Sequence, residues 1–143
     1  MTVANDIAVA LAARLSGALT PAGSWVLGTN IFDGPEQQIT SGGETIPGVC
    51  VFVLAYGGDA PVYLKGQTPG KMTDHRVQVV ARHEPDDWDG ALALANAIHE
   101  ALDANPPTGY WDVQALSAGP SPLKRDDDGR NYLVENFVCR QRT

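Results

Sequence analysis

Charged residues are scarce in this chain of 143 residues, at 19% of the sequence, compared with about 25% in an average soluble domain. Basic residues are the scarcer kind, with ten Lys and Arg against seventeen Asp and Glu and a formal net charge of −7. Nucleic-acid-binding domains concentrate Lys and Arg, because release of counterions from phosphates drives their affinity. The composition therefore argues against specific nucleic-acid binding, and the low charge permits large uncharged contact surfaces.

Long apolar runs are also absent. No stretch approaches the roughly 20 apolar residues that span a bilayer, so no membrane partner is expected, and Asn5, Asp6 and Arg14 interrupt the N-terminal apolar run where a secretory signal would be continuous. The two cysteines, Cys50 and Cys139, both lie inside apolar, strand-like runs. We therefore expect two buried thiols in a reducing cytosol and no disulfide.

The length predicts one domain, residues 1–143, and two segments have helical periodicity. The first is 3–19, which Pro21 ends; the second begins at Asp86, a suitable N-cap, and stops at 105–107. Both helices are rich in alanine and should pack closely against a flat surface. Their apolar stripes are Ile7, Leu11, Leu15 and Ala18 in the first, and Trp88, Ala91, Leu92, Ala95, Ile98 and Leu102 in the second.

Four or five strands are expected from the remaining patterns. Residues 49–56 are apolar on both alternating faces, which predicts a strand buried on both sides. Residues 74–84 alternate, which predicts a half-exposed strand. Its inward side is Val77, Val79 and Ala81, and its outward side is Arg76, Gln78, Arg82 and Glu84. Further strands are expected at 111–117, at 131–140 and, as an edge strand, within 25–32.

The predicted fold class is therefore α+β, with an antiparallel sheet of about four to five strands in mixed order covered by the two helices. Two Gly- and Pro-rich connections stand out, 57–71 and 118–130. The first is long for a compact domain, and loops of that length are usually functional or mobile.

Patterns for phosphate and metal binding are incomplete. The run from Gly66 to Lys71 has only three residues between its glycines and is followed by Met72, so it does not form a phosphate-binding loop. Aligning Gly129 with the glycine of a calcium loop puts Lys124 where the first carboxylate should be, so a solvated turn is the preferred interpretation.

Histidines and paired carboxylates also have simpler explanations. His75 and His83 lie eight residues apart on one strand, too far for one metal ion, and His99 stands alone on a helix. The acidic cluster of 84–89 lies at a strand-to-helix junction, where capping accounts for it. We predict no catalytic residues, no metal ligands and no cofactor.

Several segments, taken in order, resemble the phage tail terminator family, whose members are also known as tail completion or minor capsid proteins. The strongest piece is the turn 119–130 with its leucine, basic, acidic, glycine and arginine residues, followed by Asn136 and Phe137 in the last strand. The other segments that carry the resemblance are 28–35, 49–54 with Gly57 and Gly58, 77–82 and 98–102.

This resemblance implies a structural virion protein at the head-proximal end of a viral tail, assembled in the host cytoplasm as a homo-oligomeric ring of six copies. Its implied partners are further copies of itself, the tail tube protein and a head-proximal connector protein, while DNA passes through without specific binding. Two alternatives remain open, a head-completion or neck connector protein and a small metal-dependent enzyme domain. The net charge also suggests an acidic channel that would not hold phosphates.

The contact surfaces of such a ring are expected in the two long connections. Their length, their Gly and Pro content and their mixed charges motivate this expectation. The predicted interface residues are Lys65 and Lys71 in the first connection, and Lys124, Arg125, Asp126, Asp127 and Arg130 in the second.

Overall fold

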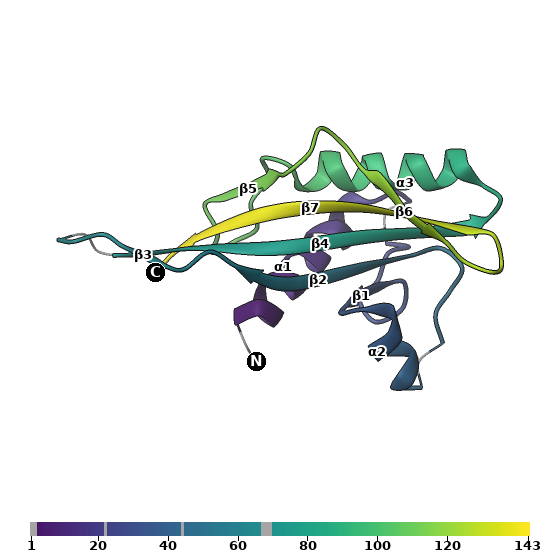
Figure 1. The fold of residues 1–143 in the computed structure, drawn as a ribbon, viewed down its shortest axis with the longest axis horizontal. Coiled ribbons are helices and arrows are strands. Elements are labelled where there is room, and N and C mark those ends of the chain that lie inside the picture. Colours follow the sequence, from purple (N-terminus) through teal and green to yellow (C-terminus); the bar gives the residue numbers. More distant parts are fainter. Residues whose placement is uncertain (1–2, 22, 44, 67–69) are drawn as a thin grey trace.

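The computed structural model describes residues 3–21, 23–43, 45–66 and 70–143. A long twisted sheet runs the length of the molecule, with helices α1 and α3 on one of its faces and the short α2 near one end (Figure 1). The helices are α1 (Val3–Ala18), α2 (Glu36–Ser41) and α3 (Trp88–Leu102). The strands are β1 (Ile31–Asp33), β2 (Cys50–Gly58), β3 (Val62–Tyr63), β4 (Lys71–Pro85), β5 (Asp112–Ala115), β6 (Ser121–Arg125) and β7 (Arg130–Arg142).

The sheet has the order β1-β2-β4-β7-β5, while β3 pairs with β4 and β6 pairs with β7. Every pair is antiparallel except β1 with β2, which is parallel. The α+β class is therefore confirmed, but the described part of the chain forms seven strands in this sheet instead of four or five. The additional strands, β3 and β6, lie inside the two connections predicted to be loops. Neither short segment has an alternating apolar pattern of its own, so the sequence did not predict these strands. They form by pairing with the long strands β4 and β7.

The face covered by α1 and α3 holds the main core. Ile7, Leu11 and Leu15 of α1 are fully buried, as predicted, whereas Ala18 is exposed and Leu19 is buried in its place. The strands contribute the side chains that alternate toward the helices. These are Val51, Val53, Val77, Val79, Ala81, Val113, Leu133, Phe137 and Cys139.

Helix α3 begins one residue later than its sequence suggested. Asp87 is the N-cap, and its carboxylate accepts a hydrogen bond from the Gly90 backbone N–H at 2.9 Å. Asp86 instead takes a positive φ of 59° in the turn before the helix. The helix buries Ala91, Ala95, Ile98 and Leu102 as expected, but Leu94 replaces Trp88, which is 43% exposed at the first turn.

The other face of the sheet is largely free of helices. A small second cluster of Phe32, Cys50 and Phe52 lies there, under Ile39 of α2 and Ile46. Strand β2 is therefore buried on both sides over its first four residues, whereas Leu54 and Ala55 are half-buried and Tyr56 is 48% exposed. The predicted burial over 49–56 holds only for the first half of that segment. Both cysteines are buried and unpaired, and burial raises the pKa of each thiol to about 12. None of the described helices is both long and apolar enough to cross a bilayer.

Candidate functional site

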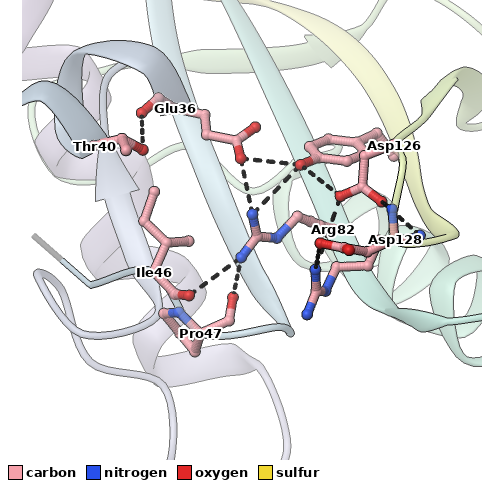
Figure 2. A network of polar contacts seen from close by, with 9 residues as sticks. Glu36, Thr40, Ile46, Pro47, Arg82, Asp126 and Asp128 are labelled. Carbon is pink, nitrogen blue, oxygen red and sulfur yellow. Dashed lines mark hydrogen bonds and ion pairs between the residues drawn. The ribbon is translucent and has the colours of Figure 1, made fainter.

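Arg82 of β4 lies at the centre of a polar network beneath α2 (Figure 2). Its Nη1 donates to Glu36 Oε1 at 2.8 Å, and its Nη2 donates to the backbone carbonyl oxygens of Ile46, at 3.3 Å, and Pro47. The hydroxyl of Tyr132 donates to the same Glu36 oxygen at 3.0 Å. One guanidinium thus connects α2 and the chain at 46–47 to the two central strands β4 and β7.

The burial of Arg82 corrects the sequence-based prediction that it faces solvent with Arg76 and Gln78. The alternation itself is right, because Arg82 lies on the sheet face away from α1 and α3. What the pattern could not show is that α2 covers this end of the face. Burial also raises the pKa of Tyr132 to about 12, so the phenol stays protonated and keeps its donor for Glu36.

The turn between β6 and β7 is shaped by Asp126 and Arg130, two of the predicted interface residues. The carboxylate of Asp126 accepts the backbone N–H groups of Asp128, at 3.0 Å, and Arg130, at 2.9 Å. Burial alone would raise the pKa of Asp126, but these hydrogen bonds outweigh it and lower the pKa below its usual value. Arg130 Nη1 donates to Asp128 Oδ2 at 2.9 Å. Both residues therefore hold the turn in shape.

The remaining predicted residues of this turn project outward. The Lys124 ammonium lies 4.5 Å from the centroid of the Tyr132 ring, in cation–π geometry. Arg125 forms an ion pair with Asp86, and both side chains are exposed. Asp127 is exposed at the tip of the turn. Five of the seven predicted interface residues are thus brought together at one end of the molecule.

Lys65 and Lys71 lie at the opposite end, where β3 projects from the sheet (Figure 1). Lys65 is exposed just after β3, and Lys71 opens β4 with backbone hydrogen bonds to Thr143 of 2.8 Å in both directions. The part of this connection at 67–69 lies outside the described residues. The predicted interface therefore divides into two separate regions.

A hollow of about 170 Å³ opens beside the Arg82 network, between the start of α2 and β6. Its walls include the apolar side chains of Phe52, Leu54, Val80 and Leu123. Lys124 and Glu36 line it as well, so charged groups lie next to an apolar floor. A hollow of this kind can accept an apolar side chain of a partner and hydrogen-bond the polar group that accompanies it.

The described residues contain no group of three His, Cys, Asp or Glu side chains placed to hold a metal ion. Glu135, which falls at the last position of the calcium-loop alignment set by Gly129, is buried under α3 with its Oε1 2.5 Å from His99 Nδ1. It therefore does not face the turn at 126–129. Burial raises the pKa of Glu135, against the opposing effect of His99.

Sequence reasoning missed Glu36 and Tyr132 and misplaced Arg82. Arg82 lies 46 positions from Glu36 and 50 positions from Tyr132 along the chain, so no local sequence pattern connects the three residues. One signal was present: Arg82 directly follows the three apolar residues Val79, Val80 and Ala81, which suggests a charge that needs a partner.

Comparison with known proteins gives a family and a fold. The family described as "Bacteriophage tail terminator protein" matches residues 44–143. A chain in the structure titled "Virion of native gene transfer agent (GTA) particle" has a TM-score of 0.67 at 16% identity. That likeness covers 99% of this chain and 100% of the other, and it shows a common fold.

Two curated proteins also match in part, both described as "Protein nucleotidyltransferase YdiU". The one from Aromatoleum aromaticum is 28% identical over 111 residues, which are 75% of this chain and 17% of that protein. The one from an Azoarcus species is 34% identical over 62 residues, or 41% and 12% of the respective lengths. The chain thus spans less than a fifth of these relatives, and the match does not establish catalysis.

Proposed function

Because this chain belongs to the bacteriophage tail terminator family, whose members are structural tail proteins, we propose that it assembles into a ring that caps the tail tube. The ring then presents the surface to which the head-proximal connector joins, and residues 1–143 act in it as one domain. The family match over 44–143 carries this proposal, because it includes β2, β4, α3 and β7, the elements that build the core.

A cap must offer different surfaces to its neighbours, to the tube and to the connector. A ring arises when a surface on one copy meets a different surface on the next and the rotation closes. Two exposed regions at opposite ends of a long molecule, the β3–β4 hairpin and the β6–β7 turn, suit such a head-to-tail contact (Figure 1). A ring of six copies is the form we propose.

The proposed role is structural and needs no catalytic step. The similarity to YdiU supports no activity in this chain, because it reaches only 17% and 12% of the lengths of those proteins. The partners we propose are the tail tube protein and a head-proximal connector, with DNA passing without specific contacts.

The test of capping is to polymerise the purified tail tube subunit with increasing amounts of this protein and to measure tube lengths by electron microscopy. Tubes should become shorter and carry a ring at one end. If their lengths are unchanged while the protein binds the head connector, the protein is a neck component. If neither is bound, the proposal fails.

Arg125 and Asp127 are suited to a test of the turn surface. Both are exposed, and the ion pair of Arg125 with Asp86 is solvent-exposed, so it contributes about 0–1 kcal/mol to stability. Replacing both residues with alanine should weaken ring assembly, measured by native mass spectrometry, while the melting temperature stays close to that of the wild type. The control, Asn96→Ala with Glu100→Ala on the exposed side of α3, should assemble normally.

A further inference from the structure

The two ends of the long sheet differ in charge. At one end of the sheet, Met72 of β4 pairs with Arg142 of β7, and we call this the arm end. At the other end, Pro85 pairs with Arg130, and we call this the turn end. At the arm end the cations Lys65, Lys71, Arg76, Arg140 and Arg142 outnumber the carboxylates Asp59, Asp74 and Asp112. Arg76 pairs with Asp59, and Arg140 pairs with Asp74 and Asp112.

The turn end has the opposite balance. Two acidic runs, Asp126–Asp128 and the segment 84–89, lie beside each other there, joined by the ion pair of Arg125 with Asp86. Together with Glu36 they outnumber the cations of this end, which are Arg82, Lys124, Arg125 and Arg130. The molecule therefore carries complementary charge at its two ends.

Exposed apolar side chains accompany the positive end. Tyr63 is 73% exposed and Val62 58% exposed on β3, which pairs only with the first residues of β4 and projects beyond the sheet (Figure 1). A large aromatic side chain in this position is typical of an anchor that a partner's pocket receives. Such a pocket lies between the middle of the sheet and the turn end, the apolar hollow walled by Phe52, Leu54, Val80 and Leu123.

We propose that Tyr63 of one copy enters this hollow in the next copy, with Lys65 facing Asp127 in the β6–β7 turn of that copy. The inference rests on the proposed ring and assigns its subunit contact. Tyr63 pairs with Lys71 at the start of β4, whereas the hollow is lined by Gln78 and Val80 of the same strand. These positions are roughly 25–30 Å apart, so the arm and the hollow cannot meet within one chain. Complementary charge selects a second copy as the occupant, since the hollow opens toward the acidic end of one copy and the arm is at the basic end of the other.

The first test is charge reversal followed by native mass spectrometry. Lys65→Glu and Asp127→Lys should each weaken ring assembly, and the two changes made together in one chain should restore it. The matched control combines Lys65→Glu with Asp89→Lys, an exposed carboxylate on α3, and should not restore assembly. Tyr63→Ser should raise the concentration needed for assembly by about tenfold or more.

The second test joins the two surfaces covalently. A mixture of Tyr63→Cys and Leu123→Cys chains should form an intermolecular disulfide, whereas Tyr63→Cys mixed with Ala97→Cys, exposed on α3, should not. The native thiols do not interfere, because both are buried.

The outcomes separate this contact from the ring itself. If wild-type protein forms no closed oligomer at any concentration, the proposed ring is wrong. If the ring forms but survives Tyr63→Ser and Lys65→Glu without change, only the assigned contact is wrong. A Tyr63 that becomes protected from chemical labelling only when the tail tube subunit is added would also overturn it.

Discussion

The guanidinium of Arg82 meets a carboxylate, a phenol and two carbonyl oxygens that come from three separate parts of the chain. Its charge is compensated by Glu36, and the ring of Tyr132 lies 6.0 Å from it. Removing one partner of a buried ion pair leaves the other charge unpaired in a region of low dielectric. This costs more than replacing both partners with apolar residues. Arg82 therefore holds α2 onto the sheet and supports one wall of the apolar hollow.

Replacing Arg82 with alanine should lower the free energy of unfolding by about 2–4 kcal/mol, less than for a fully buried pair, because the Glu36 side chain is 26% exposed. Chemical denaturation followed by circular dichroism measures it. The comparison is Arg125→Ala, which breaks an exposed pair and should cost no more than about 1 kcal/mol. Equal losses for the two variants would mean that the Arg82 network contributes little to the fold.

The lowered pKa of Asp126 predicts that the stability of the fold depends on pH. Its pKa is lowered in the folded protein, so the stability that its carboxylate contributes is present above its unfolded pKa and is lost as the pH falls through the folded value. Asp126→Asn should therefore be less stable than the wild type at pH 7, by about 1 kcal/mol from weaker hydrogen bonds to the two backbone N–H groups. The difference should disappear in strong acid, as measured by urea denaturation across pH. A difference that stayed constant would exclude the ionised carboxylate as its source.

At the scale of elements, the start of α3 shows how two adjacent aspartates take different roles. Asp87 caps the helix, while Asp86 occupies a left-handed backbone position and pairs with Arg125. The two longest strands, β4 and β7, pair with each other over nearly their full lengths. Each also pairs with a short strand, β4 with β3 and β7 with β6.

Asp87→Ala should lower stability by about 1 kcal/mol, since it removes the acceptor for the Gly90 N–H. Asp86→Asn is the matched control, because asparagine tolerates a positive φ and only an exposed ion pair is lost. Thermal denaturation of the two variants should rank Asp87→Ala clearly below Asp86→Asn. The reverse order would restore Asp86 as the cap.

At the scale of the whole molecule, the separation of charge along the sheet gives assembly a salt dependence. The cations of the arm end and the carboxylates of the turn end are mostly at the surface, where a Debye length of about 8 Å at physiological ionic strength screens them. The fraction of protein in the proposed ring, measured by analytical ultracentrifugation, should fall as sodium chloride rises from low to molar concentrations. Asp127→Lys should flatten this dependence. Assembly that strengthened with salt would indicate a contact governed by apolar burial alone.

The sequence by itself determined the α+β class, the two long helices, the long strands and the burial of Cys50 and Cys139. Each of these follows from local periodicity or from apolar surroundings, which neighbouring residues alone produce. Residues 77–81 show this, since their alternation correctly assigned the side that packs on α1 and α3.

Only the tertiary structure decided the pairing of β3 and β6, the burial of Arg82 and the separation of Lys65 and Lys71 from the turn at 124–130. These features depend on which distant segments come to lie together. From the sequence, Arg82 is expected to face solvent, but in the structure α2 covers it. The two connections are expected to form one interface, but the length of β4 separates them. A chain's local pattern defines which face of an element is apolar, but contacts between remote residues determine what covers the other face.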